Sequence, residues 1–237
     1  ITVNGKKFLK NDNSKQIKVG PSESMSKSKK NTIDPQNIID NYGADSVRLF
    51  ILSDSPPEKD VQWSEEGMSA SYKFIQKLWN LHLKILIEIE KNHTKDNSED
   101  LNKFTNKLIK NVSSNLESFS YNIIIANFHE MYSFLNKEID KGYCQKTIRE
   151  NYEKILILMM PVLPHFANEC LEIINTKKKL EWPTYDKNKL MESSIPIVVQ
   201  INGKKRGLIE VERDISETNF IELVKNDDKI KKYFENK

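Results

Sequence analysis

Residues 64–86 read SEEGMSASYKFIQKLWNLHLKIL, and this stretch decides the fold class. Large side chains recur in it every three or four positions, which places them on one face of a helix. The resulting stripe consists of Met68, Tyr72, Ile75, Trp79, His82 and Leu86. Ser64, followed by two glutamates, is typical of a helix start. The stretch therefore predicts a long amphipathic helix that packs through this stripe.

Three further amphipathic segments follow it along the chain. A second helix is expected from Leu101 to Phe119, and a third is expected over 124–139 with Gly142 at its end. A fourth spans about 145–174, where two internal prolines should kink or break it. Such helices joined by short loops predict an antiparallel bundle. Their Met, aromatic and His82 side chains are interpreted as core packing rather than as ligands.

The composition on either side of these helices differs from theirs. Residues 1–20 indicate a hairpin around Asn4-Gly5, followed by a turn over 11–14. Near the other end, 195–201 and 208–211 indicate two strands around another tight turn. Ser216 is expected to cap a short helix, and 230–234 is a further helical candidate. These last elements predict a small α+β module.

The charge and the cysteine content of the chain exclude several classes of protein. The 237 residues include 37 basic and 34 acidic ones, so the net charge of +3 does not by itself indicate a nucleic-acid partner. Two distant cysteines and four scattered histidines do not form a disulfide framework or a recognisable zinc motif. The longest apolar run, 155–160, is far short of the ~20 residues of a membrane helix. We expect a cytoplasmic protein with no metal site and no membrane contact.

Residues 22–34, SESMSKSKKNTID, combine small hydroxyl side chains with three lysines. Ammonium groups and hydroxyls both suit phosphate oxygens. No P-loop pattern is present. By chemistry alone, a solvated linker and a phosphate-handling loop both stay open. Asp34-Pro35 then indicates a helix start, and Gly43 is expected to end that helix.

The order of the residues in and after this run adds a resemblance. Met25-Ser26-Lys27-Ser28 resembles the K-M-S-K-S signature of class I aminoacyl-tRNA synthetases. The resemblance continues through Asn31-Thr32-Ile33-Asp34-Pro35 and through Tyr42-Gly43-Ala44-Asp45-Ser46-Val47-Arg48. Leu163-Pro164-His165-Phe166 and Trp182-Pro183 are similar to later tracts of the same family.

Two other tracts narrow the resemblance within that family. Residues 199–207, VQINGKKRG, and 55–64, SPPEKDVQWS, are similar to tracts of bacterial leucyl-tRNA synthetases. The same region of a valyl-, isoleucyl- or methionyl-tRNA synthetase is the alternative, and a non-catalytic tRNA-binding module is another. Because the chain starts at Ile1 and ends at Lys237 without a finished module, we expect a C-terminal piece of a longer protein.

The resemblance implies an architecture and a division into domains. The fold class is mainly α, with a helical bundle that follows the end of a catalytic α/β domain and precedes the small α+β module. The expected boundaries are 1–64 for the end of the catalytic domain, 65–182 for the tRNA-binding bundle, and 183–237 for the C-terminal module.

The resemblance also implies ligands and site residues. The whole enzyme would activate leucine with ATP and magnesium and transfer it to leucine tRNA, with leucine bound by an N-terminal part outside this chain. The piece alone should be inactive. Lys27 is the expected catalytic residue, and the expected ATP-binding residues are Ser24, Met25, Ser26, Lys27 and Ser28.

Ser24 and the cations at 204–206 complete the candidate sites. Ser24 stands where the family pattern has its first lysine, so Lys29 or Lys30 is expected to compensate. Lys204, Lys205 and Arg206 at the hairpin turn are expected to contact tRNA phosphates, with a solvated turn as the alternative interpretation.

Overall fold

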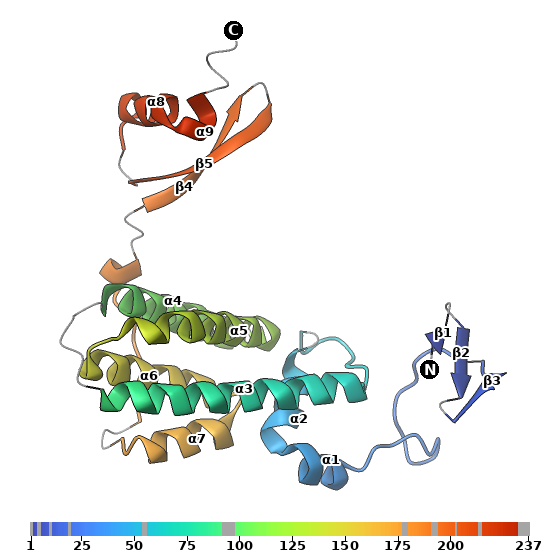
Figure 1. Cartoon of the computed structure of the whole chain (residues 1–237). Helices are drawn as coiled ribbons and strands as arrows, with labels where there is room; N and C mark the ends of the chain where they lie inside the picture. The colour runs from blue at the N-terminus through green and yellow to red at the C-terminus, as the bar shows by residue number, and fades with distance from the viewer. Residues whose placement is uncertain are drawn as a thin grey trace.

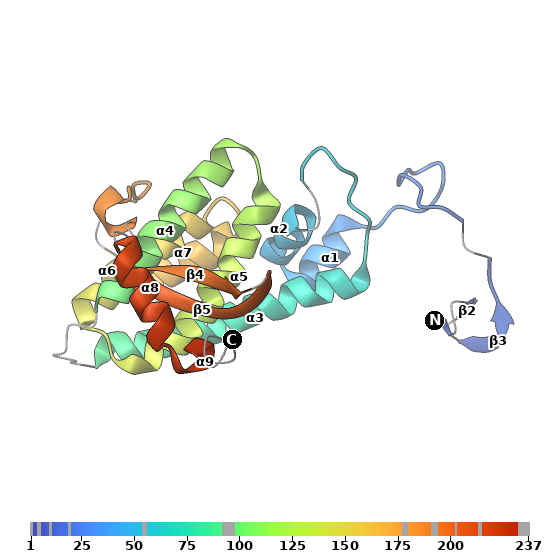
Figure 2. The same ribbon diagram turned by 90° about the horizontal axis from the view of Figure 1, so that it is seen from above.

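The structure is a computed structural model that describes residues 2–3, 6–9, 11–18, 20–53, 56–91, 98–176, 180–190, 194–201, 203–212 and 215–231. Figure 1 shows three parts along the chain. A small sheet near the N-terminus leads through an extended segment into a helical bundle, and a two-stranded module with two helices lies beyond the bundle. The view from above in Figure 2 places this C-terminal module over the bundle and the N-terminal sheet away from it.

The bundle is formed by helices that the apolar periodicity predicted. Its elements are α3 (Glu65–Glu90), α4 (Ser98–Glu117), α5 (Tyr121–Glu138), the 3-10 turn η1 (Ile139–Lys141), α6 (Gln145–Met159) and α7 (Pro164–Ile173), and two short helices precede it, α1 (Pro35–Tyr42) and α2 (Ala44–Ser53). The predicted caps are confirmed, since Asp34 accepts from the Gln36 N–H and Ser64 accepts from the Gly67 N–H. The fourth predicted helix is broken between α6 and α7, at its two prolines.

One continuous apolar core joins these helices. Its fully buried members include Phe128, Leu156 and Leu158. His82 lies inside this core with 0% exposure, and its Nδ1 is 2.9 Å from the Tyr152 hydroxyl. Burial lowers the pKa of His82 because a charged imidazole would lose its hydration there. The interpretation of His82 as a packing residue agrees with this contact, although it lies in the core rather than at its edge.

Three large side chains of the helical part lie at the surface rather than in the core. Phe119 is 63% exposed and has φ of +55°, because α4 ends at Glu117 and the chain turns there. Tyr72 and Ile51 are also exposed. Tyr72 packs its ring edge-on against Tyr42 of α1 at 5.8 Å between centroids, so a short neighbouring helix shields only part of it.

The N-terminal sheet contains the predicted hairpin pairing and adds a third strand, while the expected turn residues Asn4 and Gly5 lie outside the described residues. It contains β1 (Thr2–Val3), β2 (Lys6–Leu9) and β3 (Asp12–Gln16), paired antiparallel in that order. The expected turn over 11–14 therefore lies mostly within β3. Asp12 pairs with Leu9, and of the expected turn residues only Asn11 lies in a turn. Val19 of the expected strand region lies outside the described residues.

The C-terminal module is the predicted hairpin with helices on one face. Strands β4 (Ser194–Ile201) and β5 (Lys204–Glu212) pair antiparallel, and α8 (Glu217–Asn226) and α9 (Asp228–Lys231) follow. Ser216 accepts from the Asn219 N–H as the expected cap. Val199, Val224 and Ile230 form the module's small core. Residues 232–234 of the expected last helix lie outside the described part of the chain.

A connecting segment ties the bundle to this module. The Trp182 indole N–H donates to Ser113 Oγ at 2.9 Å, and the Asp186 N–H donates to Asn106 Oδ1 at 2.7 Å. The 3-10 turn η2 (Lys187–Leu190) also packs on α4. The connecting segment therefore runs along α4, and β4 begins close to the end of that contact.

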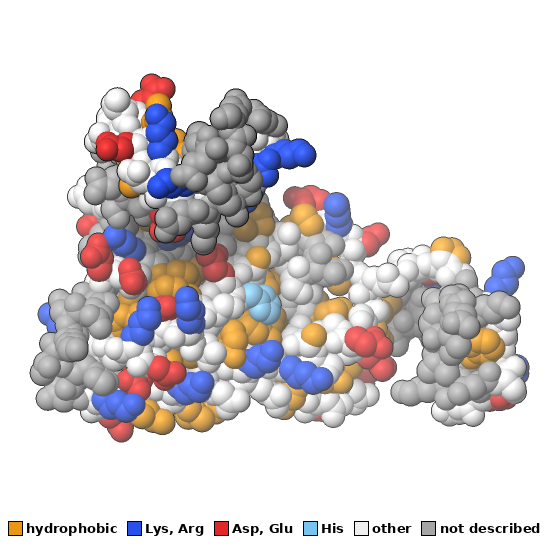
Figure 3. All heavy atoms as spheres, turned by 45° about the horizontal axis from the view of Figure 1, so that its top comes forward, with side chains coloured by type: hydrophobic (Ala, Val, Ile, Leu, Met, Phe, Trp, Pro, Cys, Tyr) orange, Lys and Arg blue, Asp and Glu red, His pale blue; other side chains and the backbone are white. Residues whose placement is uncertain are grey.

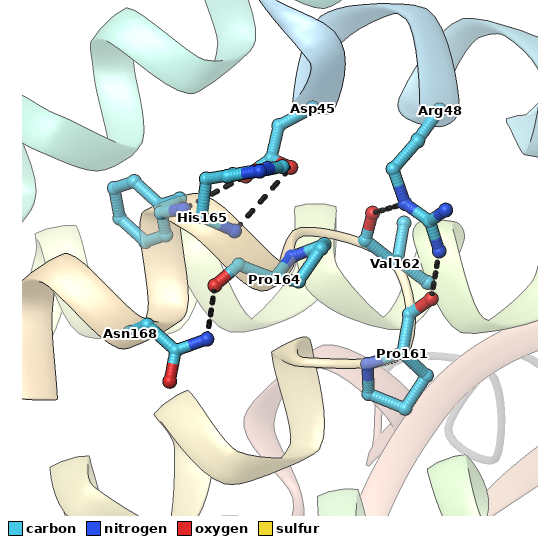
Figure 4. Close-up of polar contacts among 8 residues, drawn as sticks. Asp45, Arg48, Pro161, Val162, Pro164, His165 and Asn168 are labelled. Atoms are coloured by element: carbon cyan, nitrogen blue, oxygen red, sulfur yellow. Dashed lines mark hydrogen bonds and ion pairs between the residues drawn. The ribbon is translucent and has the colours of Figure 1, made fainter.

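A polar interlock joins the short helix α2 to the corner between α6 and α7 (Figure 4). Asp45 accepts hydrogen bonds from the Phe166 N–H at 2.8 Å and the His165 N–H at 3.4 Å, and its Oδ1 lies 2.8 Å from His165 Nδ1. Helix α7 starts with Pro164, which has no N–H, so Asp45 occupies the two donors that remain in its first turn.

Arg48 completes the interlock from the next turn of α2. Its Nε donates to the Val162 carbonyl at 3.0 Å and its Nη2 donates to the Pro161 carbonyl at 2.7 Å. Asp45 thus binds donors and Arg48 binds acceptors of the same corner (Figure 4). The D-x-x-R and P-H tracts, 113 residues or more apart in the chain, are one contact in the fold.

Replacing Asp45 by alanine should lower the free energy of unfolding by ~2–3 kcal/mol, because it leaves buried backbone donors of α7 without an acceptor. Urea denaturation followed by circular dichroism measures this change. Asp40→Ala is the matched control, since Asp40 is exposed and bonds only to Gln36 within α1. Equal losses for the two variants would contradict a structural role for Asp45.

Candidate functional site

The run from Ser24 to Lys30 forms a compact turn rather than an extended linker. The Lys29 N–H donates to the Ser26 carbonyl and the Lys30 N–H donates to the Lys27 carbonyl, both at 3.2 Å. The Ser26 and Ser28 hydroxyl oxygens lie 3.1 Å apart. Lys30 has φ of +53°, a left-handed conformation that ends the turn. The candidate phosphate-binding residues are therefore gathered in one curved segment.

Asn31 closes this segment with its side chain. Its Oδ1 accepts from the Ser26 N–H at 2.8 Å, and its Nδ2 donates to the Ser24 carbonyl at 3.4 Å. The Asn31 amide thus bonds to both Ser24 and Ser26 at the start of the turn and holds its two ends together. Because Asn31 directly precedes the tract that starts α1, the loop's shape is joined to the helix that follows it.

The three lysines of the loop differ in their surroundings. Lys29 Nζ forms an ion pair with Glu23 at 2.9 Å. Lys27 and Lys30 are exposed, and no acidic group in the described part of the chain lies within ion-pair distance of either. The exposed Lys27 ammonium is thus available to an anionic ligand, as is that of Lys30. Of the two lysines expected to compensate for Ser24, Lys29 is already paired.

The second candidate site, at residues 204–206, lies at the start of β5. Val199 pairs with Gly207 and Gln200 pairs with Lys205, so Arg206 is the extra residue of a β-bulge. Arg206 is half-buried, whereas Lys204 and Lys205 are exposed. Gly207 is required beside them, because a Cβ there would lie 2.6 Å from the Ile230 side chain. The structure therefore presents two of the three cations fully to solvent.

The two candidate sites lie on different parts of the molecule. The loop precedes α1 at one side of the bundle, and the β4–β5 hairpin lies above the other side (Figure 1). Across the described residues, no group of three His, Cys, Asp or Glu side chains could hold a metal ion. None of the helices described here has the length and apolar character needed to cross a membrane.

Residue-level reasoning missed the contacts that hold the loop and its helices. Asp45 and Arg48 bond to residues more than 110 positions away, and Asn31 bonds to Ser26 and Ser24 within its own loop. Glu23 was not singled out, although its position six residues before Lys29 leaves room for the observed turn. Only the spacing of Asp45 and Arg48, three residues apart on a helix, signalled a shared face.

Comparison with known families gives two matches along the chain. Residues 98–221 match the family described as "Anticodon-binding domain of tRNA ligase". Residues 17–64 match the family described as "tRNA synthetases class I (I, L, M and V)". The first match covers α4 to α7 and extends into α8, and the second covers the loop and helices α1 and α2.

The similar sequences are leucine–tRNA ligases. That of Bartonella tribocorum is 38% identical over 221 residues, which are 88% of this chain and 25% of the relative. That of Brucella ovis is 32% identical over 232 residues, which are 90% of this chain and 26% of the relative. The chain spans about a quarter of the length of these relatives.

A solved structure has the same fold. It is the ternary complex of Agrobacterium radiobacter K84 LeuRS with tRNA and LeuAMS, which matches with a TM-score of 0.73 and 19% identity. The match covers 90% of this chain and 29% of that one. The predicted mainly α architecture is thereby confirmed. Taken with the two family matches, these relatives show that the chain belongs to the anticodon-binding-domain family of class I tRNA ligases, as a region similar to part of leucine–tRNA ligase.

Proposed function

We propose that the chain is part of a leucine–tRNA ligase and supplies its ATP-clamping loop and two of its tRNA-binding parts. The observation that carries the proposal is the turn around Lys27, which is held by Asn31 and leaves the Lys27 ammonium exposed. The identities of the relatives support the assignment to leucine rather than to valine, isoleucine or methionine.

In the proposed reaction, the leucine carboxylate attacks the α-phosphorus of ATP, and pyrophosphate leaves. ATP enters as its magnesium complex. Negative charge on the phosphate oxygens is redistributed in the transition state, so a lysine that contacts them most strongly at that stage lowers the barrier. Lys27 is the catalytic residue in this scheme, and Ser24, Met25, Ser26 and Ser28 position ATP.

The surroundings of the loop support a role in which it moves. Most of its side chains are exposed, and its internal bonds join residues at most seven apart in the chain. A segment held mainly by local bonds can shift as a unit between open and closed positions. Lys30, which has no described acidic partner, is the proposed substitute for the charge that Ser24 lacks.

The organisation into domains is part of the same proposal. Residues 1–64 belong to the end of the catalytic domain, 65–182 form the tRNA-binding bundle, and 183–237 form a C-terminal tRNA-contacting module. The start of α3 at Glu65 supports the first boundary. A non-catalytic tRNA-binding module is the alternative function, and it would need the bundle and the hairpin but not Lys27.

Lys27→Ala in the full-length enzyme should lower the rate of leucine activation at least tenfold, because a charge-assisted contact of ~1.5–3 kcal/mol to the transition state is lost. Pyrophosphate exchange measures this rate. Lys18→Ala, an exposed lysine just before the loop, is the control and should leave the rate unchanged. An unaltered rate for Lys27→Ala would favour the non-catalytic alternative.

Asn31→Ala should reduce the activation rate about fivefold, as expected for the loss of ~1 kcal/mol of hydrogen bonding that shapes the loop. The effect should fall mainly on kcat, since Asn31 orients Lys27 and does not itself bind ATP. Asn41→Ala is the control, because Asn41 also bonds a nearby carbonyl but lies within α1. A change confined to the KM for ATP would assign Asn31 to binding rather than to loop shape.

Lys204→Gln together with Lys205→Gln should lower the slope of log affinity for leucine tRNA against log salt by about 1.5, since each phosphate contact contributes ~0.7–0.9. Binding titrations of the chain at several salt concentrations measure the slope. Lys225→Gln on α8 serves as the control within the same module. An unchanged slope would support the interpretation of 204–206 as a solvated turn.

A further inference from the structure

A cavity of about 450 Å³ opens between α4, α5, η1 and η2, away from both candidate sites. Four lysines line it, and three of them belong to α4. They are Lys103, Lys107, Lys110 and Lys141. Two acidic residues, Asp100 and Glu138, also line the cavity, so its wall carries an excess of positive charge. We call this cavity the α4–α5 pocket.

The spacing of the α4 lysines aligns their charges along the pocket. Lys103, Lys107 and Lys110 are four and three residues apart, so they lie on one face of the helix. Like charges at this spacing repel each other and disfavour the helix when no anion is bound. Between Lys107 and Lys110, which have no acidic partner among the described residues, this repulsion has a cost in the free protein that an anionic ligand would remove.

Two of the four lysines are already neutralised. Lys103 Nζ lies 2.6 Å from Glu99, and Lys141 is ion-paired with the buried Glu138. The pKa of each of these lysines is raised by its acidic partner. Lys107 and Lys110 are exposed, and no acidic partner of either occurs among the ion pairs of the described residues. The available charge of the pocket therefore resides on Lys107 and Lys110.

An aromatic surface lies beside these two ammonium groups. The rings of Phe104 and Phe134 stack with 3.9 Å between their centroids and 2° between their planes. Both side chains are half-buried and line the pocket. Cationic groups beside flat rings suit a nucleotide, whose phosphate and whose sugar and base need different surroundings. A free inorganic anion would contact the lysines but not the ring pair.

The position of the pocket agrees with an RNA ligand. Leu190 of η2 lines it, and β4 of the C-terminal module begins four residues later. In Figure 3, basic, acidic and hydrophobic side chains are mixed on the face of the bundle beneath that module. A polyanion that contacts both the bundle and the C-terminal module would therefore pass the segment that joins them, and Leu190 of that segment lines the pocket.

We propose that the α4–α5 pocket binds one nucleotide of the tRNA backbone, with Lys107 and Lys110 on the phosphates and the Phe104–Phe134 ring pair against the sugar and base. This inference rests on the proposed function, because it requires that the chain bind tRNA. The contact carries no information about sequence, so it contributes equally to leucine tRNA and to other tRNAs.

The test is the salt dependence of tRNA binding by the 237-residue chain, measured with transcripts of leucine tRNA and of one non-cognate tRNA. Lys107→Gln with Lys110→Gln should lower the slope of log affinity against log salt by ~1.4–1.8 for both transcripts. Phe104→Leu should weaken binding severalfold at every salt concentration without changing the slope, because it removes an uncharged contact.

The matched control is Lys77→Gln with Lys146→Gln, which removes two exposed bundle lysines outside the pocket. It should leave the slope within error of the unmodified chain. Thermal unfolding without RNA should give the double pocket variant an equal or higher Tm, since like charges have been removed, so weaker binding cannot be attributed to misfolding.

The outcomes separate this inference from the function on which it rests. If the unmodified chain does not bind tRNA, the proposed function of the chain as a tRNA-binding region fails. If it binds and the pocket variant keeps the full slope, the pocket proposal alone is overturned. Equal losses for the pocket variant and the control would also overturn it, because they would indicate a diffuse electrostatic effect.

Discussion

Asp45 accepts hydrogen bonds from two backbone N–H groups in the first turn of α7, and the arrangement of the other parts depends on this contact. A helix that starts with proline and lies against a neighbouring helix must find acceptors for its next N–H groups. Here the acceptor is a carboxylate that is itself only 7% exposed, supplied by α2. A carboxylate at a helix N-terminus is also favoured by the helix dipole. The contact therefore fixes α2 on the bundle, and through α1 it fixes the base of the lysine loop.

The loop and its support differ in how they are held. Asn31 and the turns around Lys27 are local contacts among exposed residues, which open at small cost. The Asp45 and Arg48 contacts connect segments more than a hundred residues apart and are partly or wholly buried. The proposed ATP-binding role requires the loop to move, whereas the helices that carry it must stay in place. The loop, which is held by local contacts, and α1 and α2, which support it, are therefore adjacent segments of the chain.

The sequence predicted the parts of this fold that depend on periodicity and on local chemistry. The stripe from Met68 to Leu86, the caps Asp34, Ser64 and Ser216, and the break at Pro161 and Pro164 all follow from local rules. It could not predict the partners of Asp45 and Arg48, since hydrogen bonds across more than a hundred residues have no local signature. It also placed a turn at 11–14 where the structure has a strand, because turn-forming residues can also occupy an exposed strand next to an irregular pairing.

For the candidate sites, too, the sequence predicted the residues but not their contacts. The order of the loop residues was enough to predict a phosphate-binding loop. The ion pair of Lys29 with Glu23 could not be predicted, because it depends on how the turn closes. Arg206 is half-buried because of a β-bulge in the strand pairing, and the residue pattern does not predict this bulge. The lysines of α4 have a spacing of four and three that places them on one face, but a solvated helix face has the same pattern, so the sequence does not identify the pocket.

The length of α3 has a consequence for evolution. Its 26 residues make a rod of about 39 Å that runs along the whole bundle from the α1–α2 end (Figure 1). Deleting one residue from such a rod shortens it by about 1.5 Å and rotates everything beyond the deletion by about 100°. The apolar stripe would then leave the core. Insertions and deletions in this region should therefore accumulate between the helices, while α3 itself acts as a spacer of fixed length between the two ends of the domain.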